Sequence, residues 1–213
     1  RLWASHVSAI LRHLRGEPDE AAAVAAAAIR LATDLGLKQW TAWGVFFHGW
    51  LATTAGRLDE GIAAMHAGLD EYRATGAELG RVYFTATLAE VHGRAGDGER
   101  GLALIDGSLA EATARSERYY AAELHRVRAG LVGEPRAAES ELRRAVTLAT
   151  QQGNRALALR AATDLAARLG GAAGRKVLAP IHGRFREGLD TADLRNVAAT
   201  LAALAPDGPV TAP

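Results

Sequence analysis

The chain carries apolar residues at helical spacing, and small residues recur at fixed places within that pattern. Two columns of small residues, seven positions apart, run through four successive segments at Ala21 and Ala28, Gly61 and Gly68, Gly101 and Ser108, and Ala138 and Ala145. Positions seven apart share one face of an α-helix, and larger apolar residues such as Met65 and Ile105 stand between them. The pattern predicts amphipathic helices whose small residues let a neighbouring helix approach closely.

Glycines interrupt the helical pattern at regular intervals. Four similar turns, "GEPDEA", "GRLDEG", "GDGERG" and "GEPRAA", begin at Gly16, Gly56, Gly96 and Gly133. A second set of markers keeps the same intervals of 40, 40 and 37 residues and lies at Gly36, Gly76, Ser116 and Gly153. Glycine suits the left-handed residue that ends a helix, and a proline or acidic residue suits the start of the next helix. Such self-similarity indicates stacked repeats of two helices each.

The turn "GDGERG" also fits the glycine fingerprint G-x-G-x-x-G of a dinucleotide-binding loop. That loop follows a β-strand, whereas the preceding segment, "RVYFTATLAEVHGRA", has helix-favouring residues and no sustained alternation. No clear βαβ unit stands in the sequence, and the other turns are in phase with this one. We therefore predict a helix–helix turn here and no cofactor.

The repeats predict an all-α fold, namely a right-handed α-solenoid of about five helix pairs with a C-terminal capping helix. We expect one repeat domain over residues 1–204 and a flexible tail over residues 205–213. The expected repeats and cap span residues 1–36, 37–76, 77–116, 117–153, 154–188 and 190–204. The helix pairs are predicted at 1–15 with 18–35, 38–55 with 58–75, 78–95 with 98–115, 117–132 with 135–152, and 154–169 with 174–187.

Small residues seven apart after a glycine–acidic turn resemble the tetratricopeptide repeat (TPR), in which that turn separates the first helix of a pair from the second. The first helix of that family carries a large and a small residue ahead of the turn. Here the corresponding pairs are Ser8-Ala9, His48-Gly49 and Leu88-Ala89. The resemblance implies a concave face, lined by the first helices, that binds a partner. The period of 40 exceeds the roughly 34 residues of this repeat and implies longer helices or loops.

Three C-terminal segments are similar to a more specific family. They are "AELHRVRAGL" (122–131), "AAESELRRAVTLATQQGNRALALRAATDLAARL" (137–169) and "LAPIHGRFREGLDTADLRNVAATLAAL" (178–204). Together they resemble the C-terminal helical repeat region of bacterial multidomain signalling regulators with a STAND-type ATPase, either linked to a nucleotide cyclase or of the LuxR type. The chain has no G-x-x-x-x-G-K-[ST] motif, so neither ATPase nor cyclase activity carries over from that resemblance.

Composition narrows the classes of function. The chain has 25 basic and 24 acidic residues, so its formal net charge of +1 gives no general reason to bind nucleic acid or an anionic membrane. It has no cysteine, which excludes disulfides, thiolate catalysis and cysteine-ligated zinc and is compatible with a reducing cytoplasm. No apolar run reaches the roughly 18 residues that a membrane span needs. The chain starts without a methionine, and we expect it to be part of a longer protein.

Aromatic residues recur at the repeat interval, since Trp3, Trp43 and Tyr83 are each 40 residues apart. In the tetratricopeptide register they would face the concave groove. The candidate binding residues of this groove are Trp3, His6, Trp43, Phe46, Trp50, Tyr83, Glu90 and Arg94. The aromatic rings could instead pack in the core or between repeats, where burial of each stabilises the fold by about 1.5–3 kcal/mol. The sequence leaves both interpretations open.

No catalytic or metal-binding constellation can be assembled from the sequence. The seven histidines show no H-x-x-x-H or H-E-x-x-H spacing, so we expect no metal site. Acidic pairs such as Asp59-Glu60 stand at predicted helix starts, where the helix dipole favours negative charge. No nucleophile, base and orienting group can be combined, so we expect no enzyme.

The sequence therefore favours a non-catalytic interaction or sensory module of a cytoplasmic signalling ATPase or transcriptional regulator. Its partner would be a protein, either the upstream domains of the same polypeptide or a signalling partner, with a small ligand as a further option. The alternative is a small-molecule receptor with an aromatic pocket around Trp43 and Trp50. The sequence has no basic run with interleaved aromatic residues, so we expect this region to bind neither nucleic acid nor a membrane.

Overall fold

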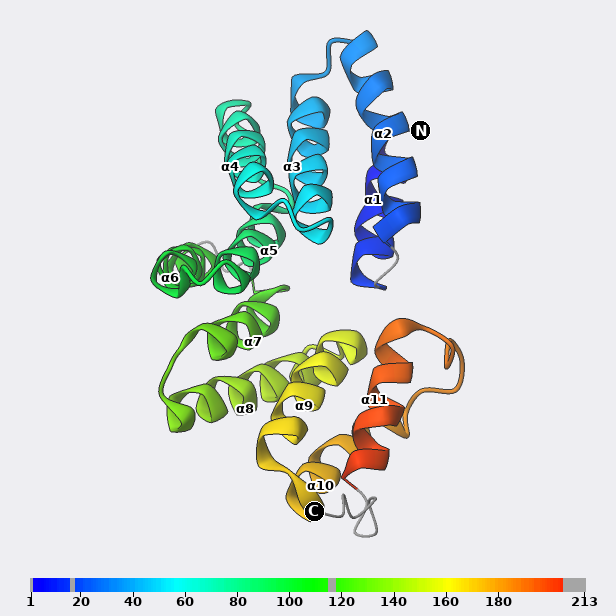
Figure 1. The fold of residues 1–213 in the computed structure, drawn as a ribbon, viewed down its shortest axis with the longest axis vertical. Coiled ribbons are helices and arrows are strands. Elements are labelled where there is room, and N and C mark those ends of the chain that lie inside the picture. The colour runs from blue at the N-terminus through cyan, green and yellow to red at the C-terminus, as the bar shows by residue number, and fades with distance from the viewer. Residues whose placement is uncertain (1, 16–17, 115–117, 205–213) are drawn as a thin grey trace. The chain divides into compact units, whose positions relative to one another are not determined.

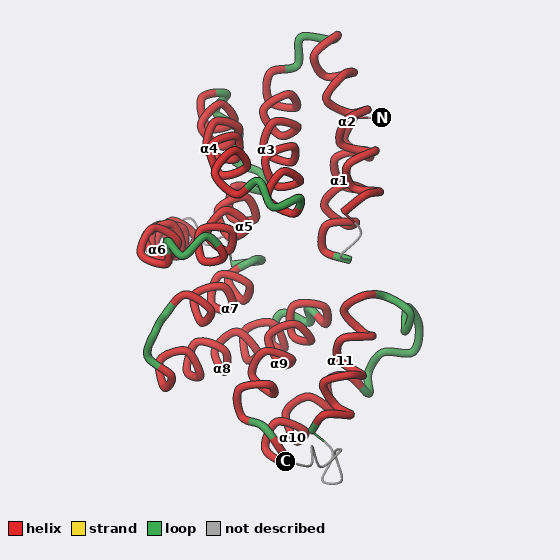
Figure 2. The backbone as a smooth tube through the Cα atoms, in the orientation of Figure 1, coloured by secondary structure: helices red, strands yellow, loops and turns green. Residues whose placement is uncertain are grey.

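The structure, a computed structural model, describes residues 2–15, 18–114 and 118–204. Within these ranges the chain forms eleven α-helices and no strand (Figure 1, Figure 2). The prediction of an all-α fold is therefore confirmed. Gly16, Ser116 and the tail over residues 205–213 lie outside the described residues.

The chain divides into two compact units, Arg1–Leu104 and Ile105–Pro213, and the boundary falls inside helix α6. The first unit holds α1 (Leu2–Leu14), α2 (Pro18–Asp34), α3 (Lys38–Thr54), α4 (Leu58–Ala74), α5 (Arg81–Arg94) and the first part of α6 (Gly98–Ala114). The second unit holds the rest of α6 and α7 (Ala121–Leu131), α8 (Pro135–Gln151), α9 (Arg155–Leu169), α10 (Gly171–His182) and α11 (Ala192–Ala203). The single repeat domain over residues 1–204 stays a prediction.

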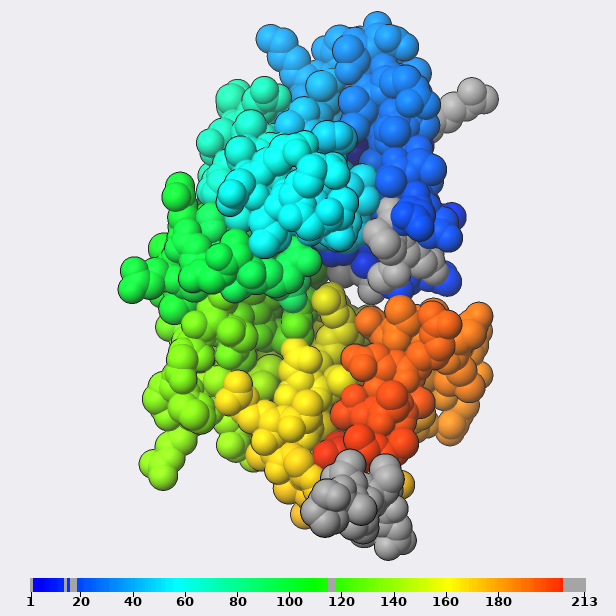
Figure 3. All heavy atoms as spheres, viewed as in Figure 1, coloured from blue at the N-terminus to red at the C-terminus, as the bar shows by residue number. Residues whose placement is uncertain are grey.

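Four of the predicted helix pairs are in contact. Helix α1 packs against α2, α3 against α4, α7 against α8, and α9 against α10. Figure 3 draws all heavy atoms as spheres, and the atoms of neighbouring helices such as α3 and α4 are in contact there. The predicted capping helix is α11, which packs against α9 and α10 through Leu194 and Val197. These two residues share an apolar cluster with Leu159 of α9 and Leu178 of α10.

Helix α10 departs most from its predicted bounds, because it begins at Gly171 rather than 174 and ends at His182 rather than 187. Pro180 lies inside this helix and has no N–H to donate to the carbonyl group one turn earlier. Gly183 then caps the helix, with its N–H bonded to the carbonyl of Ala179. The missing hydrogen bond near the C-terminal end favours this early termination.

The two columns of small residues lie at helix contacts, as predicted, and all eight residues are buried. A particularly close approach joins α3 and α4. A Cβ atom added at Gly68 would lie 2.6 Å from the backbone nitrogen of Phe46, and one added at Gly61 would lie 2.6 Å from the carbonyl oxygen of Gly49. Both distances are shorter than van der Waals contact and involve backbone atoms. Glycine is therefore required at both positions for this helix spacing.

The predicted left-handed turn glycine is confirmed in two of the repeats. Gly56 and Gly96 have φ values of 84° and 83°. Each directly follows the C-cap residue of its helix, which is Ala55 for α3 and Ala95 for α5. The next N–H after each glycine returns to a carbonyl of the preceding helix, as in the bond from Arg57 to Ala52. This geometry pairs backbone groups that a helix end leaves without partners.

The same prediction is wrong for Gly133, which has no positive φ. Helix α7 ends in an extended Val132, with φ −74° and ψ 129°. Glu134 then caps α8, since its side chain accepts hydrogen bonds from two backbone N–H groups, and Pro135 occupies the first helical position. An extended exit from α7 and a side-chain cap on α8 replace the left-handed glycine in this turn.

Candidate functional site

Five of the eight candidate binding residues lie in the interior of the first unit. Trp43, Phe46, Trp50, Tyr83 and His6 are each 7% exposed or less. They come from α1, α3 and α5, the first helices of the three N-terminal pairs. The ring centroids of His6 and Trp43 are 4.8 Å apart. The ring of Phe47 connects the rest of the set, since it contacts the rings of Trp43, Phe46, Trp50 and Tyr83. Packing among the rings accounts for their burial, and binding by them stays a prediction.

Polar atoms inside this aromatic cluster are incompletely paired. His6 Nδ1 lies 2.8 Å from the carbonyl oxygen of Leu2, and Nε2 lies 3.2 Å from that of Trp40. Burial lowers the pKa of His6, and a neutral ring can donate to only one of these carbonyls. Trp43 Nε1 is buried and has no hydrogen-bond partner among the described residues. Such an unpaired donor is unusual in a protein interior.

The other three candidates are at least partly accessible. Trp3 is 52% exposed, and its ring contacts that of Trp40 at a centroid distance of 5.9 Å. Glu90 is half-buried and Arg94 is exposed, both near the C-terminal end of α5. Arg94 Nη2 donates a hydrogen bond of 2.8 Å to Thr53 Oγ1 of α3. The structure thus brings the aromatic candidates of α3 and α5 together and leaves Trp3 and Arg94 open to solvent.

The second unit contains a polar pocket that the sequence analysis did not predict. Its volume is about 170 Å³. It is lined by Arg126 of α7, by Leu159, Arg160, Thr163 and Asp164 of α9, and by Asp193, Asn196 and Val197 of α11. Helices α7 and α9 are the first helices of their pairs, and α11 follows α10 in the place of the next first helix. The pocket therefore lies on the face for which partner binding was predicted.

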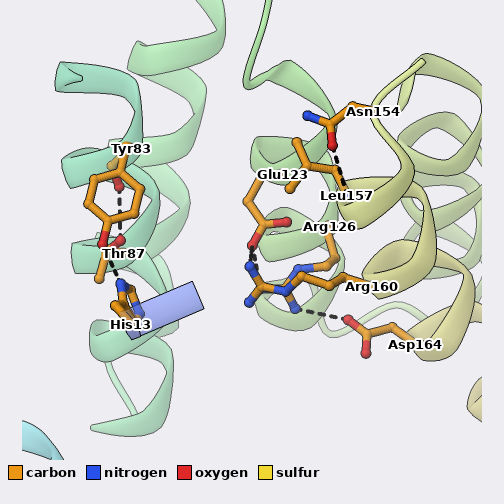
Figure 4. A network of polar contacts seen from close by, with 9 residues as sticks. All are labelled: His13, Tyr83, Thr87, Glu123, Arg126, Asn154, Leu157, Arg160 and Asp164. Atoms are coloured by element: carbon orange, nitrogen blue, oxygen red, sulfur yellow. Dashed lines mark hydrogen bonds and ion pairs between the residues drawn. The ribbon is translucent and has the colours of Figure 1, made fainter. Parts of the chain in front are cut away.

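An ion-pair network joins α7 to α9 at this pocket (Figure 4). Glu123 Oε1 accepts a hydrogen bond of 2.9 Å from Arg126 Nη2 and lies 3.0 Å from Arg160 Nη1. Arg126 Nη1 also donates to Asp164 Oδ2 at 2.9 Å. The Glu123 side chain is only 4% exposed, and its Oε2 atom has no hydrogen-bond partner in the part of the chain that the structure describes. A buried carboxylate oxygen of this kind has unused capacity to accept a hydrogen bond.

Carboxylates outnumber guanidinium groups in and beside the pocket. Glu123, Asp164 and Asp193 carry three formal negative charges, and Arg126 and Arg160 carry two positive charges. Burial raises the pKa of Asp193, and the charge of Arg160 only partly opposes this effect. The pocket therefore offers the Asp193 carboxylate too little positive charge to offset the cost of desolvation.

Repeat register explains why these charged residues meet. The first register column runs through Trp3, Trp43, Tyr83, Glu123 and Arg160. The second column runs through His6, Phe46, Ala86, Arg126 and Thr163. The intervals are 40 residues, then 37 for the last step, as for the turn glycines. Following the aromatic columns into the C-terminal half would have pointed to Glu123, Arg126 and Arg160 on the first helices, although not to the pocket that they form with α11.

Two further polar clusters connect helices within the units. In the first unit, buried His92 has Nδ1 at 3.4 Å from Asp97 Oδ2 and Nε2 at 3.0 Å from His66 Nε2. In the second unit, His125 Nδ1 of α7 lies 2.6 Å from Glu141 Oε2 of α8. Burial lowers the pKa of all three histidines. These contacts are those expected of neutral histidine rings that connect neighbouring helices.

The described residues can be searched for a metal site and for a membrane-spanning helix. Over residues 2–15, 18–114 and 118–204, no three side chains of His, Cys, Asp or Glu come together in a way that could hold a metal ion. Over the same ranges, no helix combines the length and the apolar character that crossing a membrane requires.

The sequence matches no known protein family and no curated protein. The fold does match solved structures. One is the crystal structure of a Podosopora anserina protein described as "kinesin light chain nearly identical TPR-like repeats", and another is a single-substitution variant of that protein. Each superposes with a TM-score of 0.53 at 14% sequence identity, over 95% of this chain and 95% of that chain. The chain therefore has a TPR-like helical repeat fold, which confirms the predicted all-α solenoid.

Proposed function

We propose that the chain is a non-catalytic interaction module that binds a protein partner through the first helices of its repeats. The observation that carries this proposal is the polar pocket on α7, α9 and α11. Charged residues that only keep a protein soluble are normally exposed, whereas Glu123 is buried and holds two arginines of the pocket in place. Stacked repeats provide extended binding surfaces of this kind.

In the first unit the binding face would consist of the accessible candidates Trp3, Glu90 and Arg94. The buried rings of Trp43 and Tyr83 would support that face by holding α3 and α5 together. An exposed tryptophan such as Trp3 is a typical anchor in protein interfaces, because it buries a large apolar area at little cost in conformational entropy.

We further propose that the module belongs to a cytoplasmic STAND-type ATPase regulator, of the cyclase-linked or LuxR type. Its partner is then the upstream domains of the same polypeptide or a separate signalling protein. The support is the resemblance of residues 122–131, 137–169 and 178–204 to the C-terminal repeats of such regulators. The three segments contribute Arg126, Arg160 with Asp164, and Asp193, so the region of resemblance is also the region that forms the pocket. Partner binding would act on the regulator by shifting its conformational populations.

A second candidate function is a small-molecule receptor around Trp43 and Trp50. The observation that favours it is the buried indole N–H of Trp43, for which the described residues provide no acceptor. A polar ligand atom could accept this hydrogen bond. Because all four tryptophans belong to α1 and α3, ligand binding should change the intrinsic fluorescence. Fluorescence that stays flat across a panel of candidate ligands would count against this function.

A peptide-library selection against the purified 213-residue chain tests the main proposal. We expect enrichment of peptides whose binding weakens in the first-helix variants Trp3→Ala and Arg160→Ala. The matched control is Arg143→Ala, which removes an exposed arginine from the second helix α8. Failure to enrich any peptide would overturn the proposal, and so would equal weakening by Arg143→Ala.

A further inference from the structure

We propose that the polar pocket of the second unit receives the cationic side chain of a lysine or arginine of the bound partner. The inference rests on the proposed function, since it names the partner's chemistry at the pocket on α7, α9 and α11. It goes beyond that function because neither a helical repeat nor a first-helix face specifies the charge of what it binds.

The size of the pocket fits one side chain. Its volume is about 170 Å³, whereas pockets for whole small molecules usually have about 300–1,000 Å³. The apolar residues Leu159 and Val197 line it together with polar residues. A long aliphatic stem with a charged end matches this combination, because the stem can contact apolar atoms while the charged end meets carboxylates.

The charge of the pocket favours a cation over an anion. Both guanidinium groups are already engaged, Arg126 with Glu123 and Asp164, and Arg160 with Glu123. An anion would have to share these guanidinium groups with the carboxylates of Glu123 and Asp164 and would lie close to Asp193 at the same time. A cation leaves the pairs intact and offsets the formal excess of one carboxylate that Glu123, buried beside the pocket, adds to the two aspartates and two arginines of the lining.

The pocket also supplies suitable acceptors. Asp193 and Asp164 offer carboxylate oxygens from α11 and α9, and the Asn196 amide oxygen adds a neutral acceptor. The raised pKa of Asp193 agrees with this assignment, because its main cause is burial without enough nearby positive charge. A bound ammonium or guanidinium group would supply that charge and form charge-assisted hydrogen bonds.

An NMR titration of the isotope-labelled full chain tests the inference. The probes are N-acetyl-lysine methylamide and N-acetyl-arginine methylamide, with the norleucine and glutamate analogues as neutral and anionic comparisons. We expect the two cationic probes to cause saturable shifts in amide signals of α9 and α11. The inference is wrong if the norleucine or glutamate analogue shifts these signals as strongly, or if no probe does.

A pair of isosteric variants locates the effect. Asp193→Asn should weaken binding of the cationic probes roughly tenfold, the scale expected for one hydrogen bond to a charged group. Asp190→Asn removes the same charge from an exposed position just before α11 and should leave binding unchanged. Equal weakening by both variants would mean only general charge attraction and would refute a specific pocket. Thermal unfolding confirms that each variant folds, and Asp164→Asn serves as a second pocket variant.

The inference and the proposed function fail in different ways. If selected peptides keep their affinity after norleucine replaces every lysine and arginine, the inference is wrong and the proposed function stands. If the library selection enriches no peptide, the proposed function is wrong, whereas the titration with the cationic probes still decides the chemistry of the pocket.

Discussion

At one position of the repeat the first unit has Trp43 and Tyr83, and the second unit has Glu123 and Arg160. The aromatic pair is buried among other rings, while the charged pair forms part of an ion-pair network at a pocket. In both units the second helices carry small residues at the same two positions. A helix pair therefore forms with either aromatic or charged residues at this position of its first helix. In the first unit the residues at this position pack in an aromatic core, and in the second unit they lie at the polar pocket.

The second helices differ between the units in a smaller way. In α4 of the first unit the two small positions are Gly61 and Gly68, where an added Cβ would collide with the backbone of α3. In α8 of the second unit the equivalent residues are Ala138 and Ala145, which are fully buried and already carry a Cβ. The same two positions thus accommodate a methyl group in α8 and exclude it in α4.

The largest expected effect tests the aromatic core of the first unit. Phe46→Ala should destabilise that unit by about 3–5 kcal/mol, because it empties a buried site surrounded by other rings. Arg126→Ala, two repeats further along, should cost the second unit about 1–3 kcal/mol by removing one partner of buried Glu123. Urea unfolding followed by tryptophan fluorescence reports the first unit, and far-UV circular dichroism reports both.

The comparison of these two variants would fail if Arg126→Ala shifted the fluorescence transition as much as Phe46→Ala. All four tryptophans lie in the first unit, so that result would mean that the two faces share one cooperative core.

A glycine pair tests the difference in helix spacing. Gly68→Ala should destabilise the first unit by about 1–3 kcal/mol, since the new Cβ meets backbone atoms that cannot move aside easily. Gly107→Ala in α6 meets nothing within 4 Å and should stabilise its helix by about 0.5–1 kcal/mol. Chemical denaturation measures both. A neutral Gly68→Ala variant would show that α3 and α4 can separate at little cost.

The dependence of stability on pH should be steeper for the first unit than for the second. Burial holds the pKa values of His6, His66 and His92 below the ordinary 6.5 in the folded first unit. The unfolded chain then binds more protons, so stability present above pH 6.5 is lost as the pH falls through the folded values. In the second unit His125 acts in the same direction. The raised pKa of Asp193 acts oppositely, since its contribution is present below 3.8 and is lost as the pH rises.

We therefore expect the fluorescence-monitored stability of the first unit to fall between about pH 7.5 and about pH 5.5. The part of the dichroism transition that fluorescence does not follow should change less. His6→Gln should reduce the slope for the first unit, because it removes one of the three shifted groups. A first unit that gains stability on acidification would contradict the direction of these pKa shifts.

The smallest effect on stability is expected at the exposed tryptophan. Trp3→Ala should change the stability of the first unit by no more than about 0.5 kcal/mol, because half of the side chain already faces solvent. The same variant should weaken the binding of selected peptides if Trp3 anchors the partner. Unchanged peptide affinity together with a large loss of stability would assign Trp3 to packing.

Much of the fold could be predicted because its signals are local. The spacing of Gly56 and Gly96 locates helix ends, and the seven-residue columns locate the buried face of each second helix. Predictions were less accurate where a second local signal favoured a different structure. At Gly133 an acidic cap on α8 replaced the left-handed glycine, and in α10 the proline within the helix accompanied an earlier end.

The candidate site was harder to predict. Aromatic residues that recur at the repeat interval predicted a binding groove, yet the rings of Trp43 and Phe46 pack against other rings. Glu123, Arg160 and Asp193 each resemble ordinary surface charges in the sequence, and only their joint placement makes a pocket. The role of a charged side chain depends on its neighbours in space. Here these neighbours come from positions up to 70 residues apart in the sequence, from Glu123 to Asp193.

By itself the sequence determined that the chain folds into helix pairs, where each pair turns and which faces meet, since helix propensity, glycine turns and apolar period act over a few residues. Tertiary structure alone decided how the repeated positions of the first helices are buried and which charges are paired. Burial and ion pairing depend on distances between helices that are remote in the chain. For this reason Tyr83 and Glu123, in equivalent register, have different surroundings.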